Sequence, residues 1–168
     1  SKEIKVSTEN VFLDKNKFIN LVHDALYTAK IMSYAQGMAL LAAASKKWSW
    51  DLKLGEIASM WRGGCIIRAK FLGEITKAFN ENGSLSNLLL SPAMKKEVLS
   101  RSIALREIVG MAAKTGVAIP ALASSLSYFD QYRTEFLPLN LTQAQRDFFG
   151  AHTFERTDKE GTFHVHWE

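Results

Sequence analysis

Two residues near the carboxyl end have the types and spacing needed to bind an anionic small molecule. Arg146 lies on the last stretch with helical periodicity, and His152 follows the glycine that ends this stretch. A guanidinium presents a planar fork of donors and an imidazole titrates near neutral pH, so both can converge on one anionic, hydroxylated ligand. The same spacing allows a structural role, in which Arg146 pairs with Asp147 or Glu155 while His152 fills a gap. The residues alone leave both interpretations open.

A second cluster, residues 61–68, places Arg62 and Arg68 on either side of a Gly-Gly pair. Glycines allow the backbone to approach a ligand closely at a helix start, where free N–H groups attract anions. Glycines also allow helices to pack tightly against one another, and packing is the interpretation that we favour for this segment.

The sequence gives only weak signals, or none, for a metal site, a reactive cysteine or a nucleotide-binding motif. His164 and His166 alternate in an extended segment with Glu168 on the same side, but a protein metal site ordinarily has three or four ligands, so we predict no metal site. Cys65 has no histidine close in sequence and is predicted to be a buried free cysteine. Neither glycine-rich phosphate motif is found, so we expect this chain to bind no nucleotide cofactor itself.

The composition is typical of a globular domain without disulfides. The chain has 168 residues, of which 47% are hydrophobic and 23% charged, and a single cysteine, which fits a cytoplasmic protein. The net charge of +4 is small and interleaved with acids, so nucleic acid is not an expected partner. The richest apolar stretch is about half as long as a bilayer requires, so no membrane partner is expected either.

Hydrophobic periodicity predicts an all-α fold built around one long central helix. Apolar residues recur at spacings of three and four from Phe18 to about Trp48, and Asp14 is the expected cap. Small residues on this stripe would let a second helix approach closely; they are Ala25, Ala29, Ala35, Gly37 and Ala39.

Shorter helices are predicted to follow the long one. Ser91 should cap one of them, with Pro92 as its first residue, and Gly116 should end it. The predicted ranges are 54–61, 65–80, 92–114, 120 to before Pro138, and 141–149. Residues 151–168 have no helical spacing and are predicted to form an extended tail, whose aromatic side chains need a surface that buries them.

Three segments then identify a family. They are Q-A-Q-R-D-F-F-G-A-H-T-F-E-R with the later G-T-F-H, M-W-R-G-G-C-I-I-R, and A-K-I-M-S-Y-A-Q-G. In their order and spacing along the chain, they resemble the C-terminal part of decarboxylating 6-phosphogluconate dehydrogenases. The resemblance extends from about Phe18 to Trp167. It implies NADP-dependent oxidative decarboxylation of 6-phosphogluconate to ribulose 5-phosphate in the pentose phosphate pathway, by a homodimer whose tail reaches into the partner subunit.

The resemblance also assigns roles to residues. It implies that Arg146 and His152 complete the substrate site of the partner subunit, with Arg146 holding the phosphate. It further implies a helical dimerisation domain over residues 1–150 and a tail over residues 151–168 that packs on the partner. The family's dinucleotide-binding domain and its catalytic lysine and glutamate have no counterpart in this chain, so the chain alone is expected to be inactive and to bind no NADP.

One weak internal copy of the family's catalytic motif falls at residues 20–27. Its lysine position is Asn20 and its glutamate position is Tyr27, so His23 between them is expected to be a surface residue without a catalytic role. The alternative to a fragment of the enzyme is a stand-alone helical interaction module without catalysis. The coding frame upstream of Ser1 distinguishes the two.

Overall fold

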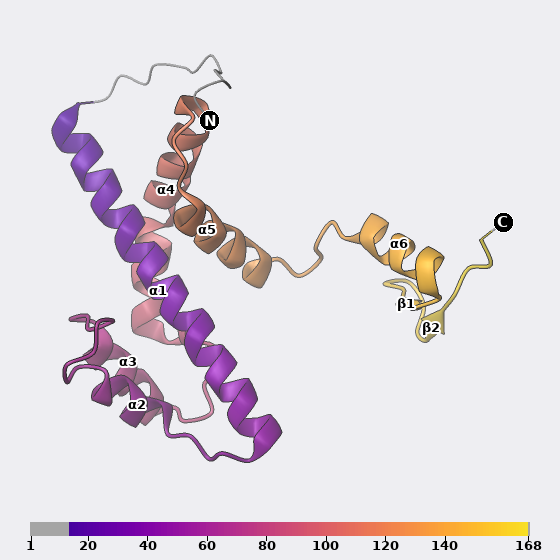
Figure 1. Cartoon of the computed structure of the whole chain (residues 1–168), viewed down its shortest axis with the longest axis horizontal. Helices are drawn as coiled ribbons and strands as arrows, with labels where there is room; N and C mark the ends of the chain where they lie inside the picture. Colours follow the sequence, from indigo (N-terminus) through magenta and orange to yellow (C-terminus); the bar gives the residue numbers. More distant parts are fainter. Residues whose placement is uncertain (1–13, 168) are drawn as a thin grey trace. The chain divides into compact units, whose positions relative to one another are not determined.

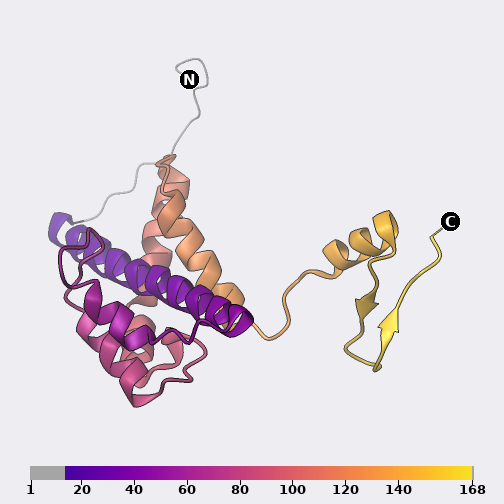
Figure 2. The same cartoon turned by 60° about the horizontal axis from the view of Figure 1, so that its bottom comes forward.

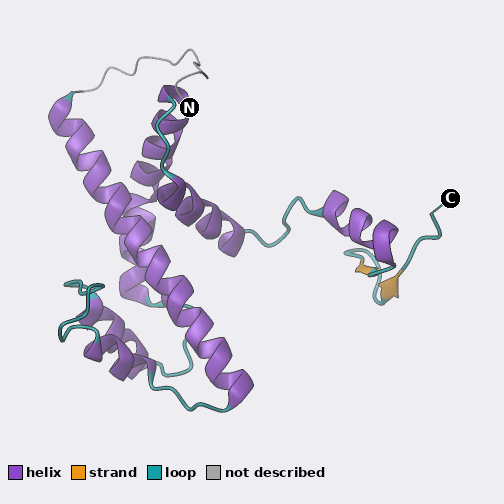
Figure 3. Cartoon of the chain, in the orientation of Figure 1, coloured by secondary structure: helices purple, strands orange, loops and turns teal. Residues whose placement is uncertain are grey.

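The computed structural model describes residues 14–167 and divides the chain into two compact units, Ser1–Asp130 and Gln131–Glu168 (Figure 1). The described residues are mostly helical, with one short pair of strands, which confirms the predicted all-α class (Figure 3). None of the helices in the described part is both long enough and apolar enough to cross a bilayer. The boundary at residue 150 predicted from the resemblance concerns the role of the tail and stays a prediction.

Helix α1, Lys15–Trp48, is the long helix that the periodicity predicts. The side chain of Asp14 caps its start by accepting a hydrogen bond from the backbone N–H of Lys17 at 2.9 Å. Ser49 ends it in the left-handed conformation, with φ at 56°. Its middle is buried, and it runs beside helix α4, Pro92–Thr115, in the first unit (Figures 1 and 2).

The small residues of α1 only partly behave as predicted. Ala25, Ala29 and Ala35 are buried, as a close helix approach requires. Gly37 is exposed, and a Cβ added there would meet nothing within 4 Å, so its place in the buried stripe was wrongly predicted. The fully buried large apolar side chains of this unit are Ile31, Met32, Met38, Leu72, Ile75, Leu88, Met94, Val98 and Leu105.

Helices α2, Leu54–Met60, and α3, Leu72–Glu81, pack together, but the predicted helix start at residue 65 is wrong. Gly64 adopts φ 79°, and residues 65–68 form a turn closed by the backbone of Arg68. Ile66 is 100% exposed and Ile67 is 42% exposed, so the apolar side chains of this turn do not pack on the core. The regular spacing that buries one face begins only at Leu72.

The start of α4 differs in one detail from the prediction, whereas its end agrees. A short 3-10 turn, η1, Leu88–Leu90, leads into it, and Pro92 occupies its first turn. Ser91 is the residue before the helix, but its side chain makes no capping hydrogen bond. Gly116 ends α4 in the left-handed conformation with φ 68°, and α5, Pro120–Arg133, begins at the predicted proline.

The second unit consists of helix α6, Asn140–Gly150, and a small hairpin. Strand β1, Phe154–Glu155, pairs antiparallel with β2, Thr162–Phe163 (Figure 2). The tail is therefore extended, as predicted, but it folds back on itself. Gly161, with φ 114°, and an ion pair of 2.6 Å between Arg156 and Asp158 stabilise the turn between the strands.

Candidate functional site

The turn that ends α6 brings the backbones of Arg146 and His152 together. Ala151 is left-handed, with φ at 49°, and its N–H donates to the carbonyl of Asp147 at 2.8 Å. The N–H of His152 donates to the carbonyl of Arg146 at 3.5 Å. The bond from the left-handed Ala151 to Asp147 is that of an αL C-cap, which turns the chain directly after a helix. Residues six apart in sequence thus lie at the same end of α6.

The Arg146 side chain lies on the surface and borders a cavity. Its Nη1 donates to Oε1 of Gln143 at 3.1 Å, and the guanidinium makes no ion pair with any carboxylate in the described part of the chain. The cavity has a volume of about 400 Å³ and is lined by Gln143, Arg146, Thr153, Phe154, Glu155 and Thr162. The donors of Arg146 that Gln143 does not use are available to an anionic ligand.

His152 is placed differently from Arg146. Its ring lies over Gly150, because a Cβ added at Gly150 would be 2.9 Å from Nε2 of His152. His152 is exposed and is not among the residues that line the cavity beside Arg146. The structure therefore joins the two predicted site residues through their backbones, whereas only the Arg146 side chain borders the cavity.

Asp147 is the structurally central residue of this unit, although from the sequence it stood out only as a neighbour of Arg146. It is 0% exposed. Its Oδ1 accepts the backbone N–H of Thr153 at 3.2 Å and Nδ1 of His164 at 2.8 Å. Its Oδ2 accepts the backbone N–H of Val165 at 2.9 Å and the indole N–H of Trp167 at 3.1 Å. One carboxylate thus fixes the residue after His152 and the end of the tail.

These hydrogen bonds determine the charge of Asp147. Burial alone would raise the pKa of its carboxyl. The hydrogen bonds from the Val165 backbone, His164 and Trp167 outweigh burial and lower the pKa from 3.8 to about 2. Asp147 is therefore a buried, fully hydrogen-bonded carboxylate at neutral pH.

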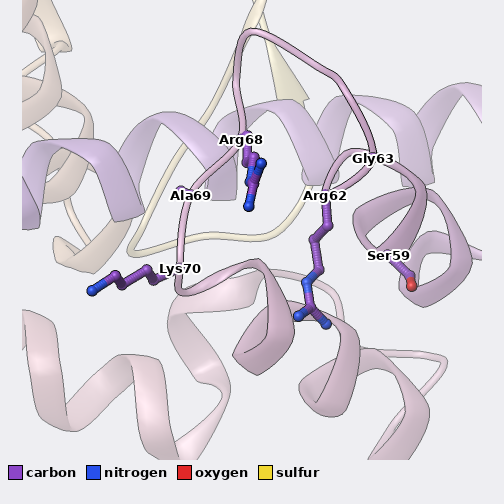
Figure 4. A pocket seen from close by; sticks show the side chains of 6 residues that line it. All are labelled: Ser59, Arg62, Gly63, Arg68, Ala69 and Lys70. Carbon is purple, nitrogen blue, oxygen red and sulfur yellow. The ribbon is translucent and has the colours of Figure 1, made fainter.

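The Gly-Gly cluster at residues 61–68 does not pack in the way that we favoured. A Cβ on Gly64 would meet nothing within 4 Å, and one on Gly63 would meet only the Met60 carbonyl, at 3.5 Å. The glycines form a loop instead, and the side chains of Arg62 and Arg68 extend from it beside a pocket (Figure 4). The free cysteine of this loop, Cys65, is half-buried rather than buried.

Two other residues singled out from the sequence take part in local contacts. The rings of His164 and His166 lie 5.1 Å apart, with His164 bound to Asp147, and no group of three metal-ligating side chains occurs among residues 14–167. Glu168, the third candidate ligand, lies outside the described residues. His23 is a surface residue, as predicted, and contacts its neighbour Asp24 at 3.1 Å.

Comparisons with known proteins agree with the resemblance seen in the sequence. Residues 1–167 match the family described as 6-phosphogluconate dehydrogenase, C-terminal domain. The decarboxylating 6-phosphogluconate dehydrogenase of Synechococcus elongatus is 54% identical over 95% of this chain and 34% of that protein. The NADP(+)-dependent, decarboxylating 6-phosphogluconate dehydrogenase of Bacillus subtilis is 53% identical over 98% of this chain and 34% of that protein.

A solved structure gives the same result. The 6-phosphogluconate dehydrogenase of Plasmodium falciparum, a protein described in its apo form and in complex with NADP+ and with 6-phosphogluconate, matches with a TM-score of 0.86 and 47% identity. The match covers 95% of this chain and 35% of that one. The chain thus spans about a third of the length of the relatives that it matches. It belongs to the 6-phosphogluconate dehydrogenase family, whose C-terminal domain it matches along nearly its whole length.

Proposed function

We propose that this chain is the C-terminal part of a cytoplasmic, NADP-dependent 6-phosphogluconate dehydrogenase that converts 6-phosphogluconate to ribulose 5-phosphate and carbon dioxide. Its membership of the family and the names of its relatives support the proposal. The reaction needs a base, a nicotinamide and an acid. In this proposal the rest of the protein supplies all three, and this chain supplies substrate contacts and dimer surface.

The proposed substrate contacts are Arg146 and His152, which act on the site of the partner subunit in a homodimer. The observation that carries this role is the state of the Arg146 guanidinium, which is exposed, borders a cavity of about 400 Å³ and is bound only to the neutral Gln143 among the described residues. A guanidinium in this state can hold a phosphate through two parallel charge-assisted hydrogen bonds. His152 follows on the same turn, where its ring can reach the hydroxyl groups of a sugar acid.

We further propose that residues 1–150 form the dimerisation domain and that residues 151–168 pack on the partner. Large apolar side chains of the second unit support this role because they are exposed, among them Phe149 at 78%, Phe148 at 57% and Trp167 at 45%. Burial of such a group against another subunit would be favourable. Asp147 would then hold the tail in the conformation that docks.

Complementation tests the shared-site role. The 168-residue chain is mixed with the Bacillus subtilis relative truncated after the position that aligns with Gly150, and NADPH formation from 6-phosphogluconate is followed. We expect the chain to restore activity that neither protein has alone. The Arg146→Ala chain should not restore it, whereas a chain with the exposed Lys95 on α4 replaced, Lys95→Ala, should. Failure to restore activity, when sedimentation shows that the two proteins associate, would contradict the proposal.

A further inference from the structure

We propose that the first unit carries a second anion site, a pocket at residues 59–70 that binds a small phosphorylated molecule independently of Arg146. The pocket has a volume of about 720 Å³ and is lined by Ser59, Arg62, Gly63, Arg68, Ala69 and Lys70 (Figure 4). It is large enough for a phosphate group together with the organic part of a metabolite.

The charged residues that line this pocket are all cationic. Three of its lining residues, Arg62, Arg68 and Lys70, are cationic, and none of the lining residues is acidic. None of the three cations forms an ion pair with a carboxylate within the described residues, whereas arginines elsewhere do: Arg101 pairs with Asp24 and Glu97, Arg106 with Asp130, and Arg156 with Asp158. Like charges brought together without acids repel one another, and an anion in the pocket would remove that repulsion.

The loop that carries these cations is fixed by hydrogen bonds within the protein. The N–H of Arg62 donates to the Ser59 carbonyl at 3.1 Å, and the N–H of Arg68 donates to the Cys65 carbonyl at 3.1 Å. The hydroxyl of Tyr34, on α1, donates to the Ile67 carbonyl. Two of these bonds close local turns and the third links the loop to α1. A loop held in this way loses less freedom when a ligand binds, so more of the interaction energy appears as affinity.

Arg62 and Arg68 both line this pocket. In Figure 4, Arg62 and Arg68 come from opposite sides of the loop, while Lys70 extends away from both. The Arg62 guanidinium lies over the first turn of α3, since a Cβ on Gly73 would meet its Nη1 at 3.9 Å. No side chain caps that turn. The backbone N–H groups of Leu72 and Glu74 in that turn already donate to the carbonyls of Ala69 and Phe71, so the attraction for a phosphate comes from the cationic side chains.

A phosphate ester fits these features better than a nucleic acid does. Planar guanidinium forks match phosphate oxygens in pairs, and Ser59 adds a hydroxyl donor. Sites for single-stranded nucleic acids combine a long basic groove with aromatic side chains on which bases stack, and no aromatic residue lines this pocket.

Calorimetric titration with inorganic pyrophosphate tests the proposal on the 168-residue chain. The Arg62→Gln/Arg68→Gln double variant removes two positive charges from the pocket. The Lys95→Gln/Lys96→Gln variant removes two from exposed positions on α4 and serves as the matched control. We expect saturable binding that is weakened at least about tenfold in the arginine variant and changes less than about twofold in the lysine variant. Equal weakening in both variants, or no saturable binding, would overturn the proposal.

Two further measurements distinguish this pocket from the Arg146 site and from a nucleic-acid surface. In Arg146→Ala, the pyrophosphate binding that depends on Arg62 and Arg68 should persist with the same affinity, even if a separate binding event at Arg146 is lost, so failure of the proposed function and failure of this site are distinguishable. NMR of the unmodified chain should show pyrophosphate shifting the Nε–H signals of Arg62 and Arg68 but not that of Arg106, which keeps the test valid if a variant misfolds. Shifts confined to other arginines, or displacement of pyrophosphate by a single-stranded oligonucleotide that binds more tightly, would contradict a small-molecule site.

Discussion

Nδ1 of His164 lies 2.8 Å from the carboxylate of Asp147, a residue 17 positions earlier in the chain. Val165 and Trp167 donate to the other oxygen of the same group. Three donors within four residues of the tail, from His164, Val165 and Trp167, therefore bind one buried carboxylate of α6. We therefore expect the conformation of the tail to depend on whether this carboxylate is ionised.

The first prediction is that low pH releases the tail from Asp147. Because the folded pKa of Asp147, about 2, is below its ordinary value of 3.8, the ionised carboxylate stabilises the second unit. This stabilisation is fully present above pH 3.8 and is lost as the pH falls toward 2. The indole N–H signal of Trp167 should keep its position above that range and move to the position of an unbound indole below it.

The Asp147→Asn variant is the control for this titration. Its amide presents one accepting oxygen instead of two, and it cannot ionise. The Trp167 signal should already be displaced at neutral pH and should not titrate between pH 2 and 3.8. A signal in the variant with the position and pH dependence of the unmodified chain would show that Asp147 does not hold the tail.

The second prediction concerns Arg146 in a complete enzyme. Arg146→Ala should raise the KM for 6-phosphogluconate by about 100-fold, as expected for the loss of roughly 3 kcal/mol of phosphate binding. The affinity for NADP should change little. Steady-state kinetics with each substrate varied in turn measure both values, and an unchanged KM for 6-phosphogluconate would remove Arg146 from the site.

The third prediction uses the contact between Gly150 and His152. A Cβ at Gly150 would lie 2.9 Å from Nε2 and 3.1 Å from Cδ2 of the imidazole, so Gly150→Ala must displace the ring. The ring is free to move outward, so stability should change by less than about 1 kcal/mol. The ring protons of His152 should shift in NMR spectra, and the KM for 6-phosphogluconate in a complete enzyme should rise. An unchanged KM with a displaced ring would exclude His152 from substrate binding.

The fourth prediction compares two helical glycines. At Gly55 an added Cβ would lie 2.5 Å from Oδ1 of the exposed Asn80, whose side chain can rotate away, and 3.3 Å from the Thr76 carbonyl, which belongs to the α3 backbone, so Gly55→Ala should destabilise the first unit by about 1 kcal/mol. At Gly37 it would meet nothing within 4 Å, and Gly37→Ala should stabilise α1 by about 0.5–1 kcal/mol through its higher helix propensity. Denaturant unfolding of both variants should give changes of opposite sign.

The fifth prediction compares two apolar residues of α4. Leu105 is fully buried, so Leu105→Ala leaves a cavity and should cost about 2–5 kcal/mol of unfolding free energy. Ile103 is 65% exposed, and Ile103→Ala should change that free energy by less than about 1 kcal/mol. Similar losses for both variants would mean that the side of α4 facing the core is wrongly assigned.

Much of the helical framework could be predicted because its signals are local. The Asp14 cap, the glycine at 116 and the proline at 120 act on the backbone within one turn, and each marks a helix end where the structure has one. The apolar spacing of α1 likewise depends only on residues of that helix. Local signals failed at residues 65–71, where a helix was predicted to start directly after the Gly-Gly pair. The segment forms a turn and loop instead, and the helix begins only at Leu72.

The arrangement of the site could be predicted only in part. Arg146 and His152 stood out by residue type, and the turn that joins them follows directly from a helix end. The role of Asp147 depends on donors far along the chain, and its position beside Arg146 suggested an ion pair that the structure does not contain. The cationic pocket similarly depends on the fold of a loop whose glycines suggested packing.

Among its described residues, the second unit has a charged residue, and no apolar one, in its interior. Asp147 is its only buried residue among positions 131–167, and its large apolar side chains, such as Leu141 and Phe149, remain 74% and 78% exposed. A segment of this size without an apolar core has little free energy with which to offset the entropy of ordering its backbone. Its folding and its association with another surface are therefore one coupled equilibrium, and the temperature at which it melts should rise with the concentration of the chain.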